Sequence, residues 1–281
     1  MDGRGLQTDT QEKYLSFMER VLVHARNPIV QIMRDDGVAF PRRIRKEIKV
    51  LQQDEIEDIR AVAPSIRGSM GEPETWRAAK ASFLVSMYLA TGLRPSELRM
   101  AQLEDLNLRR WRLKVRHPKG EGRYGVQRTV LILPEYRAEV ERFLEERDSY
   151  VKATGLDRAT FLIPNLRAGK DGHYSSNHFR ELKKELQEAS GVEFRLKDFR
   201  STYATTITAE DSSLLNDVSV MLGHSSTKTT QTFYARMSSD VSASRIEKAM
   251  TERAAERGES SKAADPEKAE FGGKFEITGY N

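Results

Sequence analysis

The chain has 281 residues, of which 31% are charged and 38% hydrophobic, and its formal net charge is +4. This balance is ordinary for a soluble, helix-rich protein with one substantial core and a smaller domain or tails. The lack of cysteine excludes disulfides and thiolate metal sites, and no apolar run approaches the ~20 residues that cross a bilayer. The first residues also lack a signal-peptide core. We therefore expect a cytoplasmic protein without a membrane partner, and the positive charge weakly favours a polyanionic one.

The N-terminal part combines a helical pattern with a basic run. Residues 10–34 place apolar side chains at helical spacing, and the polar break "RDDG" follows. The next segment, "PRRIRKEIK", crowds five bases around Glu47, namely Arg42, Arg43, Arg45, Lys46 and Lys49. Pattern alone leaves two interpretations open for these bases, a solvated helix start or contact with phosphate groups.

A cluster of acids opens the next predicted helix, over residues 51–62. Asp54, Glu55, Glu57 and Asp58 could be mistaken for a metal site. They fall in the first turns, where acidic side chains favour the positive end of the helix dipole. We therefore interpret them as surface residues and expect no metal or other cofactor.

The middle of the chain changes from helical to strand-like periodicity. An apolar helix over residues 81–92 ends at Gly92, and another begins at Arg94 with Pro95 in its first turn. Apolar residues then alternate with bases around 111–115 and 130–132, which predicts a small antiparallel unit. Its connection, "RHPKGEGRYGVQRTV", contains a literal G-x-G-x-x-G.

This glycine-rich connection does not fit a nucleotide-binding loop. A dinucleotide fingerprint needs strand, glycines and then helix, whereas strand-like sequence lies on both sides here. No kinase V-A-I-K, H-R-D or D-F-G accompanies it, and no Walker sequence is present. We interpret the glycines as a hairpin tip that carries Lys119.

The rest of the chain is predicted to be helical, followed by a polar tail. Amphipathic patterns cover residues 134–151, 175–190, 197–210, 212–223 and 227–237, with a weaker one over 239–256. The polar stretch 257–274 is predicted to be disordered. We divide the chain into a short helical N-terminal segment (1–48), a main domain (49–250) and a tail (251–281).

Cations gather at predicted helix starts, where they oppose the helix dipole. Arg94 directly precedes one helix, and Lys197 and Arg200 share one face at the start of another. Either a bound anion or a neighbouring acid offsets each of them, and Glu97 is the candidate acid for Arg94.

The chain resembles the tyrosine recombinase (phage integrase) family in four short strings and one lysine, which follow one another in a fixed order. They are "ATGLRPSEL", the hairpin lysine, "LKDFRSTYAT", "MLGHSS" and "TTQTFYARM". The similarity covers roughly residues 50–245 and is greatest to the simple Xer-like members. It implies a mainly α (α+β) fold, a helical catalytic domain around a small three-stranded antiparallel sheet. By motif matching it implies that Arg94 and Arg200 are paired catalytic arginines, Lys119 the hairpin lysine, His224 the histidine and Tyr234 the nucleophile.

The chemistry suits these residue types. Two guanidinium groups can neutralise the charge that grows on a phosphodiester, and a tyrosine can hold the strand as a 3′-phosphotyrosine without metal. A lysine on the hairpin can protonate the departing 5′-oxygen. The chain departs from the family at Lys197, where histidine is usual, and we assign Lys197 to charge stabilisation before general-base action.

The resemblance also implies partners: double-stranded DNA, further protomers forming a tetramer on paired sites, and an optional accessory DNA-binding protein in the nucleoid. The 48 residues before the catalytic domain are fewer than the family's usual four-helix DNA clamp contains, so either the clamp is reduced to about two helices or part of it is missing from this chain. The basic run from Arg42 to Lys49 would then lie at the interdomain junction, as the expected backbone contact. Two alternatives remain open, a DNA-binding protein of this fold that no longer cuts, and a type IB topoisomerase-like relaxing enzyme.

Overall fold

The computed structural model describes residues 6–42, 48–67, 72–123, 125–166 and 171–224, together with residues 246, 250 and 251. The backbone forms two compact units, Met1–Glu47 and Ile48–Asn281. The N-terminal unit holds α1 (Thr8–His24) and α2 (Ile29–Asp35). The larger unit holds α3 (Gln53–Val62), α4 (Glu74–Thr91), α5 (Pro95–Arg99), β1 (Leu106–Asn107), β2 (Arg112–Val115), β3 (Arg128–Leu131), α6 (Arg137–Ala153), α7 (Ser176–Ser190), α8 (Leu196–Glu210) and α9 (Leu215–Leu222). None of the helices in the described ranges is long and apolar enough to cross a membrane.

The N-terminal unit is a pair of helices, which lie within or close to the helical spacing found over residues 10–34. The break falls around Pro28, whose ring removes the backbone N–H that a continuing helix would use. Arg34 of α2 donates two hydrogen bonds to the Glu19 carboxylate of α1, at 2.6 and 2.9 Å. No residue of α1, which is described over its whole length, is buried.

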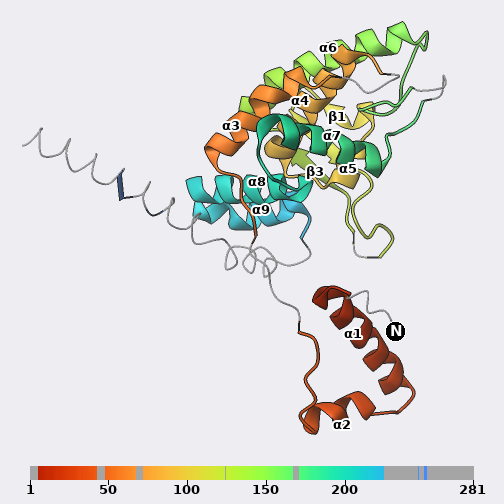
Figure 1. Ribbon diagram of the computed structural model, residues 1–281. Helices are drawn as coiled ribbons and strands as arrows, with labels where there is room; N and C mark the ends of the chain where they lie inside the picture. The colour runs from red at the N-terminus through yellow and green to blue at the C-terminus, as the bar shows by residue number, and fades with distance from the viewer. Residues whose placement is uncertain are drawn as a thin grey trace, which may run out of the picture. The chain divides into compact units, whose positions relative to one another are not determined.

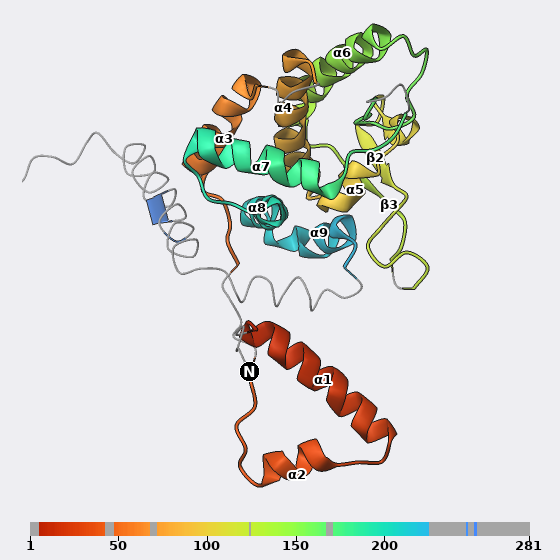
Figure 2. The same cartoon turned by 45° about the vertical axis from the view of Figure 1, so that its right-hand side comes forward.

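Helix α4 is the centre of the larger unit. In Figures 1 and 2 it lies between α6 on one side and α8 and α9 on the other. Aromatic stacking joins α4 to α6, with ring centroids 3.7 Å apart for Phe83 and Phe143 and 4.5 Å apart for Trp76 and Tyr150. The near-continuous apolar sequence of α4 follows from this burial on several sides.

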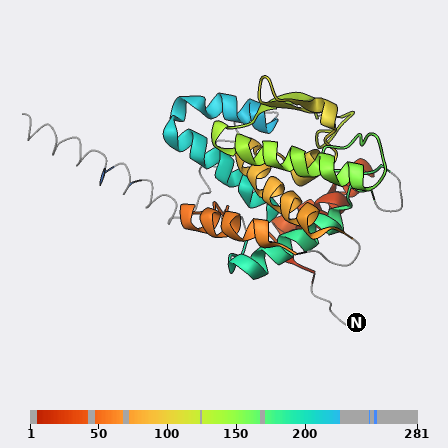
Figure 3. The ribbon, with the colours of Figure 1, turned by 90° about the horizontal axis from the view of Figure 1, so that it is seen from above.

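The three-stranded antiparallel sheet has the order β1–β2–β3, which confirms the predicted fold class. Leu113 pairs with Val130, and Val115 lies opposite Arg128 on the same face of the sheet. Leu113, Val115 and Val130 are all buried, so the apolar residues of the alternating pattern face the core together. Figure 3 shows the sheet beside α9 at one edge of the unit, with α3 and α7 at the other.

A buried ionic cluster ties α4 to the segment before α7. The Glu72 carboxylate accepts hydrogen bonds from Arg77 at 3.2 Å, from Lys80 and from the Tyr174 hydroxyl, and all these side chains are buried. A buried charge is tolerated when it is paired in this way. The helix α7 that follows, capped by Ser175, therefore has a defined starting point.

Candidate active site

Arg94 is positioned by the start of the short helix α5. It is the N-cap residue, and Glu97 in the first turn accepts hydrogen bonds from its backbone N–H at 3.0 Å and from its Nη1 at 2.8 Å. Glu97 was the candidate acid for Arg94, and the structure pairs the two. The Arg94 side chain keeps 25% of its surface exposed, and its remaining guanidinium nitrogens have no hydrogen-bond partner within the described part of the chain.

Glu97 has a second cationic partner, Arg128 of β3. Arg128 donates from Nη1 and Nη2 to the two carboxylate oxygens, at 3.1 and 2.7 Å. Burial raises the pKa of Glu97, but the hydrogen bonds and positive charges of Arg128 and Arg94 outweigh it and hold that pKa below its ordinary value. Glu97 is therefore an ionised, buried carboxylate between two arginines.

Arg200 links the C-terminal ends of two helices. From the first turns of α8 it donates to the carbonyl of Gly92, which ends α4, at 2.8 Å, and to the carbonyl of Leu222 at the end of α9. Helix-terminal carbonyls lack partners inside their own helix and carry partial negative charge, so a guanidinium is favoured there. Burial, followed by the nearby charge of Arg94, lowers the pKa of Arg200 to about 9, which leaves it cationic at neutral pH.

His224 follows the end of α9. Gly223 has a φ of +64°, and the backbone N–H of His224 donates to the carbonyl of Ser219 at 3.0 Å, the pattern of a Schellman motif. Its Nε2 lies 3.1 Å from Nη2 of Arg200. Burial and then the charges of Arg200, Arg94 and Arg128 lower the pKa of His224 to about 4. A guanidinium can only donate, so Nε2 accepts and the imidazole is neutral.

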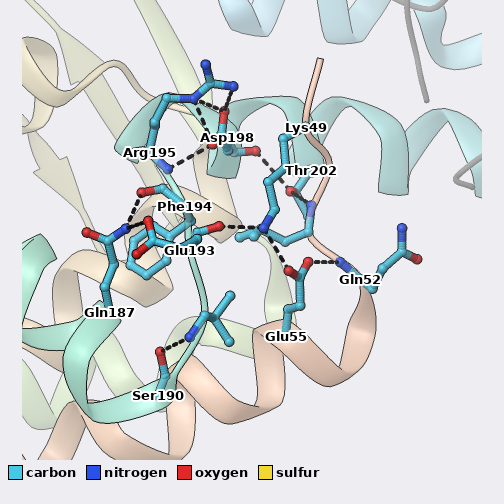
Figure 4. Close-up of polar contacts among 12 residues, drawn as sticks. Lys49, Gln52, Glu55, Gln187, Ser190, Glu193, Phe194, Arg195, Asp198 and Thr202 are labelled. Carbon is cyan, nitrogen blue, oxygen red and sulfur yellow. Dashed lines mark hydrogen bonds and ion pairs between the residues drawn. The ribbon is translucent and has the colours of Figure 1, made fainter. Parts of the chain in front are cut away.

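The start of α8, which carries Lys197 and Arg200, is held in place from both sides (Figure 4). Asp198 accepts from the backbone N–H of Arg195 at 2.8 Å, and Thr202 accepts from the backbone N–H of Leu51 at 2.9 Å. The ammonium group of Lys49 donates to Glu55 at 2.8 Å and to the carbonyl of Glu193. Lys49, expected as a DNA contact, is thus paired within the protein.

Lys119 lies in the connection between β2 and β3. Gly120 and Gly122 take positive φ values of +82° and +75°, and the N–H of Gly125 donates to the carbonyl of Gly120 at 2.9 Å. A Cβ on Gly125 would come within 2.7 Å of the carbonyl of Lys119. The glycines therefore allow the loop to close on itself, and the Lys119 side chain is exposed without a hydrogen-bond partner among the described residues.

One open cleft brings these cations together. Its volume is about 1080 Å³, and Arg94, Lys119, Lys197 and Arg200 line it although they come from separate segments. The cleft continues along α7, whose contribution includes further bases. Its bases are Arg94, Arg99, Lys119, Arg180, Lys183, Lys184, Arg195, Lys197 and Arg200, whereas its acids are Glu188 and Glu193. A cleft dominated by one sign of charge concentrates a polyanion.

Other predicted site residues fall elsewhere. His224 does not line the cleft but contacts Arg200, which does. Arg42 is exposed in the N-terminal unit. Tyr234, Arg43, Arg45 and Lys46 lie outside the described residues, as do the helix expected over 227–237 and most of the one expected over 239–256.

Sequence reasoning missed Arg128 and the bases of α7. Arg128 lies two residues before the buried Val130, so alternation places it on the core-facing side of β3, but its partners, Glu97 and α9, lie far away in the sequence. Arg180, Lys183 and Lys184 belong to an amphipathic helix whose polar face is indistinguishable from an ordinary solvated one.

Helices around a small three-stranded antiparallel sheet form the fold of the tyrosine recombinases, a class of enzymes of DNA recombination. The model of the phage integrase family matches residues 49–240, so the chain belongs to that family. Tyrosine recombinase XerD of Bradyrhizobium diazoefficiens is 28% identical over 243 residues, which cover 83% of this chain and 73% of that protein.

Solved structures share the fold. The crystal structure of XerA recombinase superposes with a TM-score of 0.56 at 18% identity, covering 86% of this chain and 82% of that one. XerH site-specific recombinase bound to difH substrate, a pre-cleavage complex, gives a TM-score of 0.53 at 18% identity, covering 76% of this chain and 56% of that one. Xer recombinases are therefore among the family members to which this chain is similar.

Proposed function

We propose that the chain is a site-specific recombinase that cleaves and rejoins DNA strands through a covalent 3′-phosphotyrosyl intermediate. The observation that carries this proposal is the shared cleft of Arg94, Lys119, Lys197 and Arg200, which are brought together from three segments: the start of α5, the β2–β3 connection and the start of α8. Although Glu97 accepts from one nitrogen of Arg94, bases outnumber acids along the cleft, and such an excess of cations suits an anionic group such as a phosphodiester.

In the proposed reaction the hydroxyl oxygen of Tyr234 attacks the phosphorus and the bond to the 5′-oxygen breaks. Lys119 gives a proton to the 5′-oxygen as it leaves, and the phenolic proton passes to water. Arg94 and Arg200 stabilise the additional negative charge on the two non-bridging oxygens, in the way that preorganised donors stabilise other transition states. Rejoining is the reverse sequence, with a 5′-hydroxyl as the nucleophile.

Lys197 and His224 have supporting roles in this proposal. Lys197 lies one turn before Arg200 on α8, is exposed to the cleft and adds positive charge there. Neutral His224 holds the Arg200 guanidinium at 3.1 Å, so Arg200 keeps its orientation without a competing carboxylate. The guanidinium pair supplies the charge neutralisation that a metal ion provides in other phosphodiester-cleaving enzymes.

The bases along α7 extend the cleft and would contact the DNA backbone on one side of the scissile phosphate. XerH, whose fold this chain shares, was solved bound to its difH substrate. We further propose that residues 1–48 form a DNA-binding segment with Arg42, Arg43, Arg45 and Lys46 as backbone contacts. Residues 49–250 would be the catalytic domain, acting as a tetramer on paired sites.

Covalent capture tests the proposal. Purified protein is incubated in EDTA with a random-sequence pool of nicked suicide duplexes, in which the cleaved end diffuses away, and protein-linked DNA is recovered under denaturing conditions and sequenced. We expect a protein–DNA adduct with a recurring target sequence. The matched control is Tyr234→Phe, which lacks only the attacking hydroxyl and should bind the recovered target without forming an adduct.

Each other outcome has a definite meaning. Binding of a recurring sequence without adduct by the native protein supports the DNA-binding alternative. Adducts without sequence preference support the topoisomerase-like one. An adduct formed by Tyr234→Phe would assign the nucleophile to another residue.

A further inference from the structure

Arg128 joins three elements that carry the candidate catalytic groups. Its strand, β3, is one side of the hairpin that bears Lys119, and its guanidinium pairs with both oxygens of Glu97 in α5. Its Nε donates to the carbonyl of Met221 in the last turn of α9, at 2.6 Å. The Arg128 side chain is 8% exposed and does not line the cleft, so it has no access to a bound phosphodiester.

We propose that Arg128 is a positioning residue for strand cleavage, which holds the start of α5 and the end of α9 at the separation that the two catalytic arginines require. This inference rests on the proposed function. It adds a group that acts through Glu97 and the backbone of α9 and does not touch the DNA.

The charge arrangement around Glu97 explains why a second arginine is needed. With Arg94 as its only partner, a buried carboxylate would hold the Arg94 guanidinium strongly and compete with a phosphate for it. Arg128 supplies two hydrogen bonds and a full positive charge to the same carboxylate. Arg94 then uses one nitrogen on Glu97 and presents the rest of its guanidinium to the cleft.

The end of α9 is shaped around the same guanidinium. A Cβ on Gly223 would lie 3.0 to 3.1 Å from Nη1, Cζ and Nε of Arg128, tighter than ordinary contacts allow. Arg128 and Arg200 hold the carbonyls of Met221 and Leu222, respectively. The two arginines thus bind neighbouring carbonyls in the last turn of α9, just before Gly223 and His224.

The test compares Arg128→Met, Arg128→Lys and a control, Arg112→Met, which alters an exposed arginine on β2. For each protein we measure single-turnover cleavage of the captured target at saturating enzyme, affinity for the uncut duplex, and the pH titration of the His224 ring by NMR without DNA. The charged groups facing His224 are Arg200 of α8, Arg94 at the start of α5 and Arg128 of β3, so each element around it contributes to the titration.

We expect Arg128→Met to slow cleavage by about 10²-fold, the cost of a small misplacement of catalytic groups, at nearly unchanged affinity. Removal of its positive charge should move the His224 titration to higher pH by roughly half a unit. Arg128→Lys keeps the positive charge but lacks the planar guanidinium that donates to both oxygens of Glu97. It should therefore leave the His224 titration near that of the native protein and still slow cleavage. Arg112→Met should change none of the three.

The outcomes separate this inference from the proposed function. Native-like cleavage by folded Arg128→Met, or by Arg128→Lys if the methionine variant does not fold, would overturn the positioning role while strand cleavage stands. Slower cleavage that comes entirely from weaker DNA binding would also overturn it. If the native protein captures no DNA, the proposed function fails, whereas an unchanged His224 titration in Arg128→Met would refute the placement of Arg128 independently.

Discussion

Nη2 of Arg200 lies 3.1 Å from Nε2 of His224, and a permanent cation at this distance requires the imidazole to be neutral. The folded-state pKa of His224 is about 4, below its ordinary value of 6.5. Protons therefore bind more readily to the unfolded chain between these two values, and the free energy of unfolding must fall as the pH drops from about 6.5 to about 4.

We predict that His224→Gln removes part of this acid sensitivity. The full pKa shift would correspond to about 3–4 kcal/mol of stability lost in acid, and because solvent screens this partly exposed ring the actual loss is smaller. Urea unfolding at pH 7 and pH 5 should show a smaller difference for His224→Gln than for the native protein. His24→Gln, at the exposed end of α1, serves as the control. Equal differences in all three proteins would refute the neutral, cation-facing imidazole.

We predict that alanine variants of Arg94 and Arg200, the two arginines proposed to be catalytic, separate catalysis from stability. Each should slow strand cleavage by at least about 10²- to 10³-fold, the cost of one preorganised donor. Arg94→Ala should scarcely change the melting temperature, because Glu97 keeps Arg128 as its partner. Arg200→Ala should lower it, because the carbonyls of Gly92 and Leu222 lose a buried donor, at about 1–3 kcal/mol for each unsatisfied group. Cleavage rates near the native value in either variant would contradict the two-arginine cleft.

We predict that the bases of α7 set DNA affinity and its dependence on salt. The double variant Arg180→Ala/Lys183→Ala removes two cations of the cleft, and the slope of log K against log salt should become shallower by about 2. Cleavage at saturating protein should remain within a few fold. Arg142→Ala/Lys152→Ala removes the same charge from the exposed face of α6, outside the cleft. A similar change of slope in both double variants would show a general effect of net charge instead of specific DNA contact along α7.

We predict that Gly92→Ala destabilises the protein more than Gly191→Ala. Both glycines end helices with positive φ, +61° and +72°, so both variants incur the left-handed backbone penalty of about 1–2 kcal/mol. A Cβ at Gly92 would also lie 2.5 Å from Cδ1 of Tyr203 and 2.8 Å from Cδ2 of Leu222, whereas no atom lies within 4 Å at Gly191. Overpacking adds a further 1–3 kcal/mol or so. Equal losses in chemical denaturation would show that the contact at Gly92 relaxes freely.

Much of the fold could be predicted from the sequence because its signals are local. Gly92 and Gly223 end helices as predicted, Ser175 caps α7, and the alternation around Leu113 and Val130 marks paired strands. The helical spacing over 10–34 does not locate the break between the two helices, because the apolar periodicity continues across Pro28 although the helix does not.

The site was less predictable because its partnerships join distant segments. Lys49 stands in a run of bases, and nothing in the local sequence indicates that its ammonium group donates a hydrogen bond to the carbonyl of Glu193. Glu97 was identified as a partner of Arg94 from their spacing, whereas its bond with Arg128 depends on how β3 packs against α5. Charge assignments made along the chain therefore need the tertiary structure before they distinguish a free cation from a paired one.

Arg128 and Arg200, which bind the last carbonyls of α9, also fix the point from which the following residues extend. Tyr234 stands ten positions after His224, and ten residues span at most about 36 Å when fully extended. In the proposed reaction the scissile phosphate must therefore lie within that span of His224, extended by the tyrosine side chain. The position of His224 is in turn fixed through the α9 carbonyls that Arg128 and Arg200 hold.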